Sequence, residues 1–200
     1  METREKVLEK LEEKFSEIIF GVLKLDEYCD ITHLKETPKR MAKMYFDELL
    51  SGVYNNPDNL VKEFPLKNKS EQYQDSIAPV IVRDIEIRSL CSHHFMPFYG
   101  TCDIVYIPDK VLIGLSKFSR ISDHFSRKPQ VQEVLTKEIL EFIFDKIDPL
   151  AIGVKIKATH LCMKHRGAKS NGEMETYLIK TKDRYSELYS VIENLLLKGN

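Results

Sequence analysis

The run from Cys91 to His94 (Cys-Ser-His-His) holds the densest group of metal-binding side chains in the sequence. Cys91 and His94 are three residues apart, so both could bind one metal ion from a strand end or a turn. Cys162 lies two residues from His160 and could join them if the fold brings the two segments together. Two thiolates and one imidazole suit zinc, and three protein ligands would leave a fourth position for water, which is the catalytic pattern. Zinc would lower the pKa of that water to about 7.

Two alternatives to a catalytic metal site stay open on the residues alone. Cysteines are also common as small buried residues, and we favour that interpretation for Cys29 and Cys102. It suits Cys91 less well, because the two adjacent histidines would be costly to bury without partners. A fourth ligand, His93 or His160, would instead close the site and make it structural.

Two histidines beside the candidate ligands could transfer protons. In a continuous strand, His160 and Cys162 would point to the same face, so His160 would reach into the pocket around the metal. The pKa of histidine lies near neutral pH, which suits proton transfer. His93 is the second candidate because it adjoins a ligand. For each histidine, the alternative role is support of the metal ligands.

Basic side chains recur at helical spacing elsewhere in the chain. The segment from Gly114 to Arg120 is predicted to enter a helix with Ser116 as its N-cap, which would leave backbone N–H groups free to bind an anion. Lys117 and Arg120 share a face of that helix because they are three residues apart. The alternative is that such cations are solvated surface charges. The cations that could together hold a polyphosphate are Lys117, Arg120, Arg40, Lys43 and Arg166.

Gln132 and Glu133 fall in the first turn of a predicted long helix, off its apolar stripe. Glu133 could simply complement the dipole of that helix. A carboxylate in this position could also accept the N1–H and amino hydrogens of a ring such as guanine. The residues alone favour the first interpretation.

Hydrophobic periodicity predicts the elements that must position these side chains. Residues 53–76 are polar and are predicted to form a loop region. The order of elements predicts an α+β fold, a four-stranded antiparallel sheet with helices on one face, preceded by an N-terminal helical extension. We divide the chain into a helical region, 1–52, and a catalytic domain, 53–200, whose open sheet edges favour pairing with other copies. Helices are expected over 4–24, 37–50, 116–127, 129–147 and 182–197, and strands over 77–91, 99–107, 152–162 and 174–180.

The composition limits the classes of partner. The 200 residues carry 30 Lys plus Arg against 31 Asp plus Glu and no Trp, which speaks against a nucleic-acid-binding protein. No apolar run approaches the roughly 20 residues of a membrane span, and no apolar signal core follows the N-terminus. We therefore expect a cytoplasmic protein whose four cysteines bind metal or are buried and do not form disulfides.

Six motifs, in this order along the chain, resemble those of the GTP cyclohydrolase I family. The similarity is weaker before residue 30 and after residue 170. The motifs are Glu36–Met44 (ETPKRMAKM), Cys91–His94 (CSHH), Tyr106–Pro108 (YIP), Ile113–Lys117 (IGLSK), Arg127–Thr136 (RKPQVQEVLT) and Ala158–Gly167 (ATHLCMKHRG).

The resemblance implies the tunnelling fold (T-fold), in which subunits join their sheets into rings and two pentameric rings stack into a homodecamer with active sites between subunits. It implies a zinc cofactor held by Cys91, His94 and Cys162, and GTP as a substrate that reacts with water to give formate and 7,8-dihydroneopterin triphosphate. The remaining implied roles are an acid–base pair, His93 and His160, assisted by Ser116, then a purine anchor, Gln132 and Glu133, and a triphosphate site, Ser116, Lys117, Arg120 and Arg166 with Arg40 and Lys43.

Three departures from the family pattern concern rate and specificity more than the class of reaction. Ser92 stands where Glu is usual, His165 stands where a small or apolar residue is common, and residues 172–176 replace a strand rich in Ser and Thr.

Two rival functions remain. One is another T-fold purine or pterin enzyme, with a nucleophilic cysteine and no zinc, and the other is a non-catalytic assembly module with a closed structural zinc site.

Overall fold

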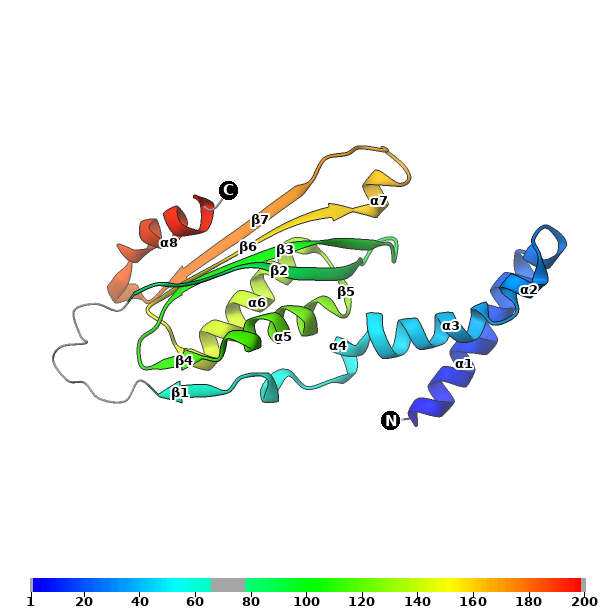
Figure 1. Cartoon of the computed structure of the whole chain (residues 1–200), viewed down its shortest axis with the longest axis horizontal. Coiled ribbons are helices and arrows are strands. Elements are labelled where there is room, and N and C mark those ends of the chain that lie inside the picture. The colour runs from blue at the N-terminus through cyan, green and yellow to red at the C-terminus, as the bar shows by residue number, and fades with distance from the viewer. Residues whose placement is uncertain (1, 66–77, 199–200) are drawn as a thin grey trace. The chain divides into compact units, whose positions relative to one another are not determined.

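A computed structural model of the chain describes residues 2–65 and 78–198 (Figure 1). Ile77, where the first strand was predicted to begin, and residues 66–76 of the predicted loop lie outside the described residues. The contacts divide the chain into two units, Met1–Tyr54 and Asn55–Asn200. The cysteines and histidines of the metal motif all belong to the second unit. In the described part of the chain, no helix combines the length and the apolar character needed to span a membrane.

The first unit is made of helices, and its two main helices pack against each other. Phe15 stacks on Tyr45 with ring centroids 5.5 Å apart, and Arg4 Nε donates to Asp47 Oδ1 at 2.8 Å. The predicted helices over 4–24 and 37–50 are confirmed. The elements are α1 (Arg4–Ser16), which continues as a π-helical turn (Glu17–Val22), a 3-10 turn (Leu25–Glu27), α2 (Ile31–Leu34), α3 (Thr37–Lys43), which continues as a second π-helical turn (Met44–Leu49), and α4 (Ser51–Tyr54).

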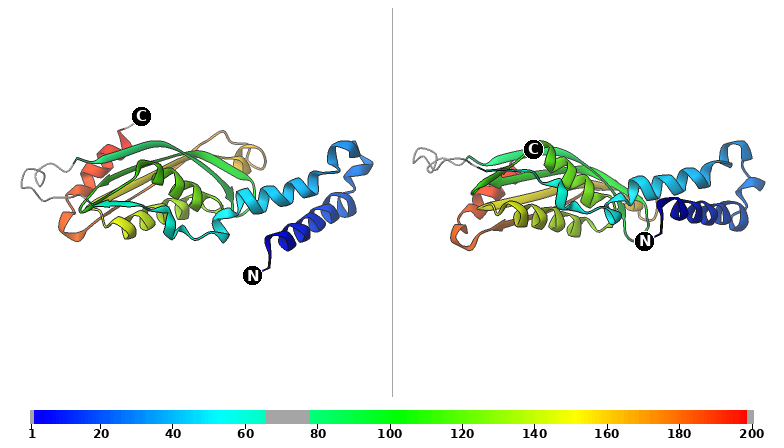
Figure 2. Two further views of the ribbon diagram at one scale, coloured as in Figure 1. Left: turned by 60° about the horizontal axis from the view of Figure 1, so that its bottom comes forward. Right: turned by 90° about the horizontal axis from the view of Figure 1, so that it is seen from below.

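The second unit is built on four long strands that all pair antiparallel, as predicted, and their order in the sheet is β2-β3-β6-β7. Figure 2 shows these strands running side by side. A two-residue strand, β5, extends the sheet by pairing in parallel with β2, and β1 pairs with β4 in a separate two-stranded sheet. The strands are β1 (Glu63–Pro65), β2 (Val80–Cys91), β3 (Pro97–Ile107), β4 (Val111–Ile113), β5 (Pro129–Gln130), β6 (Ala151–His160) and β7 (Met174–Thr181).

Helices pack on both faces of the sheet, whereas the sequence pattern predicted one covered face (Figure 1). Ile104 and Tyr106 of β3 belong to the core under α5 and α6, while Val105 and Ile107 belong to a second core under α8. A Cβ added at Gly153 would lie 2.6 Å from Ile192 Cγ2, so α8 lies directly against β6.

Two helices of the second unit begin later than the periodicity predicted. The helix predicted from 129 begins at Gln132, because Pro129 and Gln130 form β5. The helix predicted over 182–197 begins at Leu188, after a separate 3-10 turn. The helical elements are a 3-10 turn (Pro57–Leu60), α5 (Leu115–Ser126), α6 (Gln132–Ile147), α7 (Leu161–Lys164), a 3-10 turn (Asp183–Tyr185) and α8 (Leu188–Leu197).

Candidate functional site

The metal motif occupies the tight loop between β2 and β3. β2 ends at Cys91, whose backbone N–H donates to the oxygen of Met96 at 2.8 Å, and the N–H of Phe95 donates to the oxygen of Cys91 at 2.8 Å. Phe95 has a left-handed φ of 53°, where the chain turns back into β3. The N–H of Ser92 donates to the oxygen of Gln130 at 3.0 Å, so β5 holds the loop from its other side. The backbone therefore presents the motif at one end of the sheet.

Cys162 reaches this loop because β6 pairs antiparallel with β3. The register sets His160 opposite Phe98, so the end of β6 lies beside the loop that precedes β3. The chain leaves the strand after His160 and forms α7, a four-residue helical turn that carries Cys162. The strand predicted over 152–162 thus ends two residues early. The expectation that His160 and Cys162 share one face of a strand was wrong, because Cys162 belongs to a turn.

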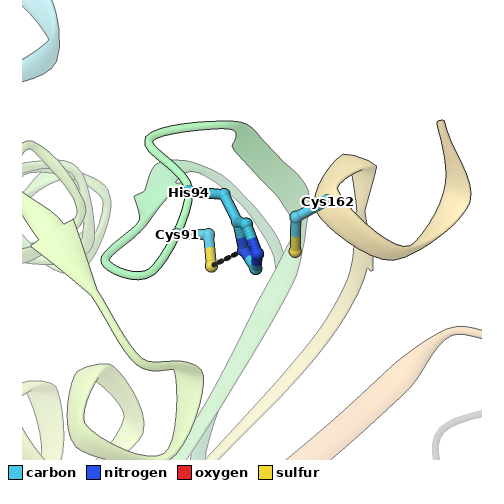
Figure 3. A group of neighbouring side chains, drawn as sticks. All are labelled: Cys91, His94 and Cys162. Atoms are coloured by element: carbon cyan, nitrogen blue, oxygen red, sulfur yellow. Dashed lines mark hydrogen bonds between the residues drawn. The ribbon is translucent and has the colours of Figure 1, made fainter. Parts of the chain in front are cut away.

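The side chains of Cys91, His94 and Cys162 converge from these two segments (Figure 3). Their ligand atoms all lie within 4.8 Å of one another, and Cys91 Sγ is 3.8 Å from His94 Nδ1. Cys91 is buried, Cys162 is half-buried and His94 is exposed, so the group is open toward solvent on one side. Two sulfurs and one imidazole nitrogen are a donor set that zinc prefers. Within residues 2–65 and 78–198, no fourth Cys, His, Asp or Glu joins this group.

The charges around Cys162 also suit a bound cation. Burial raises the pKa of the Cys162 thiol, and the neighbouring Cys91 raises it further, first through a hydrogen bond that favours the protonated thiol and then through repulsion between two adjacent thiolates. The positive charge of Arg166 acts in the opposite direction. A divalent cation between the two sulfurs would stabilise both thiolates.

His93 lies beside this group without joining it. Its Nδ1 is 3.7 Å from Cys91 Sγ, and its ring centroid is 6.2 Å from that of His94. The residue is exposed. This placement is compatible with both roles predicted for His93, proton transfer and support of a ligand.

His160 is held from two sides at the end of β6. Its ring stacks on the buried Phe98, with centroids 4.5 Å apart and planes 6° apart. Its Nε2 lies 2.7 Å from Gln132 Oε1. Burial lowers the pKa of His160, and the charge of Glu133 partly opposes this effect, so the neutral ring is favoured in the folded protein.

Gln132 and Glu133, the residues predicted to anchor a purine, lie in different environments. Both fall in the first turn of α6, as predicted. Glu133 is exposed, whereas Gln132 is 1% exposed. The amide nitrogen of Gln132 lies 3.1 Å from the backbone oxygens of Ile156 and Met174. Glu133 is therefore accessible to a ligand, and the Gln132 side chain belongs to the protein interior.

The helix predicted to bind an anion begins earlier than expected. α5 starts at Leu115 with Gly114 in the cap position, and the N–H of Lys117 donates to the oxygen of Gly114 at 2.8 Å. Ser116 is therefore the second residue of the helix, and its prediction as the N-cap was wrong. Ser116 and Arg120 are exposed and Lys117 is half-buried.

The other predicted phosphate ligands are also at the surface. Arg166 is exposed just after α7, where its charge acts on Cys162. Arg40 and Lys43 are exposed on α3 of the first unit. The structure thus places the charge of Arg166 close enough to the metal group to act on Cys162. Arg40 and Lys43 belong to the other unit.

Two residues that support the site were not predicted. Phe98 supplies the surface on which His160 stacks, and its apolar strand gave no signal of that role. The side chain of Gln130 donates to the oxygen of Phe125 at 2.9 Å and to Glu138 Oε2 at 2.6 Å, which anchors the strand that holds the metal loop. Its place within the motif 127–136 was the available signal.

An α+β unit with a solvent-open group of three sulfur and nitrogen ligands, and a histidine held beside it, has the features of a catalytic metal centre. Comparison with known families identifies which one. The family model of GTP cyclohydrolase I matches residues 11–190, so the chain belongs to the GTP cyclohydrolase I family. The resemblance carried by the six motifs is thereby confirmed.

Individual relatives cover most of the chain. Proteins named GTP cyclohydrolase 1 from Acetivibrio thermocellus and Leptospira biflexa are 40% and 46% identical to it over 165 and 144 residues. These alignments span 82% and 72% of this chain and 82% and 75% of the two relatives. A protein of the same name from Aquifex aeolicus is 42% identical over 150 residues, which are 75% of this chain and 76% of that protein.

Proposed function

We propose that the protein hydrolyses GTP to formate and 7,8-dihydroneopterin triphosphate, with a zinc ion held by Cys91, His94 and Cys162. The observation that carries this proposal is the convergence of these three side chains from two distant segments into a group that is open toward solvent. Membership of the GTP cyclohydrolase I family supports GTP as the substrate. A closed structural site would need a fourth ligand, and none joins the group among the described residues.

The chemistry divides between the metal and the histidines. Zinc at this site would supply a Lewis acid that lowers the pKa of a bound water to about 7. His93, whose Nδ1 lies 3.7 Å from Cys91 Sγ, and His160, which precedes Cys162 by two residues, move protons to and from the opening guanine ring. Ser116 assists the later opening of the ribose.

Charged side chains bind the parts of the substrate that do not react at the metal. Glu133, an exposed carboxylate in the first turn of α6, accepts the N1–H and amino hydrogens of guanine. The triphosphate undergoes no reaction and serves to orient the base over the metal. The cations that hold it are Lys117, Arg120 and Arg166, with Arg40 and Lys43.

The catalytic domain, 53–200, which follows the helical region 1–52 in the sequence, assembles with copies of itself into a homodecamer of two stacked pentamers. The open edge of β7 supports this, because the backbone groups of an edge strand pair readily with another sheet. Tyr177 and Leu178 of this strand are 43% and 41% exposed. Mass photometry of the purified protein should show particles of about ten chains. A monomer at micromolar concentration would contradict the proposal.

Incubation of the purified protein with GTP tests the function directly. We expect release of formate together with a pterin chromophore, loss of both products after treatment with a chelator, and recovery on adding zinc. Zinc-loaded protein that releases no formate would contradict the proposed reaction. Turnover that continues in the chelated, zinc-free protein would contradict the role of the metal.

A further inference from the structure

Gln132 lies inside the protein with both ends of its amide engaged. It is 1% exposed. Its amide nitrogen lies 3.1 Å from the backbone oxygens of Ile156 and Met174, and its amide oxygen lies 2.7 Å from His160 Nε2. Backbone oxygens only accept hydrogen bonds, so the end of the amide that faces Ile156 and Met174 is the NH2 group. The oxygen therefore faces His160.

A pair of threonines supports the same orientation of the amide. Thr136 Oγ1 donates to the backbone oxygen of Gln132 at 2.9 Å, which uses its one hydrogen. The contact of 2.7 Å between the hydroxyls of Thr136 and Thr176 therefore uses the hydrogen of Thr176. The oxygen of Thr176 is left to accept from the Gln132 amide nitrogen, 3.1 Å away. Turning the amide round would set its oxygen against two carbonyl oxygens.

The contact with Gln132 decides which nitrogen of His160 carries the hydrogen. An amide oxygen cannot donate, so the hydrogen between the two side chains belongs to His160 Nε2. In the neutral ring, Nδ1 then carries the lone pair. The stacking of the ring on Phe98, with planes 6° apart, opposes rotation that would exchange the two nitrogens.

We propose that Gln132 is a positioning residue that holds His160 in the tautomer with hydrogen on Nε2, so that Nδ1 is the atom that exchanges a proton with the substrate. This rests on the proposed function of His160 in GTP hydrolysis. It gives Gln132 a role through His160 in place of the direct purine contact that the motif implied, and it leaves Glu133 as the purine anchor.

Gln132→Met tests the effect on catalysis, because methionine has a similar length and cannot accept the hydrogen of Nε2. We expect kcat to fall by about 100-fold, the scale of general acid–base catalysis, with KM for GTP changed by no more than about twofold. Bound zinc should stay at the wild-type level. The matched control is Glu133→Gln on the neighbouring residue, for which we expect KM to rise while the tautomer of His160 stays unchanged.

Nitrogen-15 NMR of protein labelled at its six histidines reads the tautomer without any assay of activity. The signals of His160 are those lost in His160→Asn. At about pH 8, where histidine is neutral, we expect the wild-type ring to carry its hydrogen on Nε2. In Gln132→Met we expect a mixture of the two tautomers.

Two results would overturn the inference: a wild-type His160 with hydrogen on Nδ1, or an unchanged kcat in Gln132→Met. If Gln132→Met does not fold, the wild-type spectrum still decides which nitrogen is protonated. A wild-type protein that does not turn over GTP would overturn the proposed function, and with it the proposal that His160 exchanges a proton with GTP. The spectrum would still show separately whether Gln132 sets the tautomer.

Discussion

Replacing Cys162 by serine should weaken zinc binding without disturbing the fold. Serine keeps the shape of the side chain but exchanges a soft thiolate for a poor zinc ligand. Cys162 is half-buried on the four-residue turn α7, outside the sheet. Structural zinc sites bind with roughly 10–16 kcal/mol through four ligands, which is about 2.5–4 kcal/mol per ligand. At 1.4 kcal/mol per factor of ten, the loss of one of three ligands should weaken zinc binding by about 50- to 1,000-fold.

Competition with a chromophoric zinc chelator measures this loss, and far-UV circular dichroism checks that the fold is kept. Cys29→Ser is the matched control, because Cys29, which was predicted to be buried, is in fact an exposed cysteine of the first unit and takes no part in the three-ligand group. Its zinc affinity should equal that of the wild type. An unchanged affinity in Cys162→Ser would refute the reasoning, as would an equal loss in both variants.

Three further substitutions or conditions test other parts of the structure. His160→Ala should keep bound zinc and the melting temperature while GTP turnover falls by about 100-fold or more, and loss of folding instead would indicate a structural role. Gly153→Ala sets a Cβ 2.6 Å from Ile192 Cγ2, so the free energy of unfolding in urea should fall by about 1–3 kcal/mol, and an unchanged curve would contradict the packing of α8 on β6. Burial lowers the pKa of His124, so below its ordinary value of 6.5 the unfolded chain binds a proton that the folded chain does not, and stability should fall as the pH drops through that value. This slope should be smaller in His124→Gln, and an identical slope would show that other groups cause it.

The strands and main helices could be predicted because their signal is local. Ile85 and Ile87 alternate with exposed residues along β2, as a half-buried strand requires. The errors fall where distant partners decide. Gln130 is extended because it pairs with Cys91, 39 positions earlier in the sequence, and Pro129 gave no local sign of this strand because proline is also common at the first position of a helix. Val105 and Ile107 belong to a run of four consecutive apolar residues, 104–107. This run breaks the alternation of apolar and polar residues, and it was an unused signal that the end of β3 is buried on both faces.

The residue types of the candidate site were readable from the sequence, and their distances were not. Spacing suggested that Cys91 and His94 bind one metal ion, but only the pairing of β3 with β6 brings Cys162 within 4.8 Å of them. The burial of Gln132 is less predictable still, since its side chain contacts residues 24 to 44 positions away. A glutamine next to an exposed glutamate gives no local sign of which one faces inward.

Zinc K-edge X-ray absorption of the purified protein is the most direct test of the three-ligand metal site. We expect about one zinc per chain, with two sulfur atoms at about 2.3 Å, one imidazole nitrogen and one light atom from solvent. A first coordination shell filled by four protein ligands, or a shell without two sulfurs, would contradict a metal held by Cys91, His94 and Cys162 with a position left open for water.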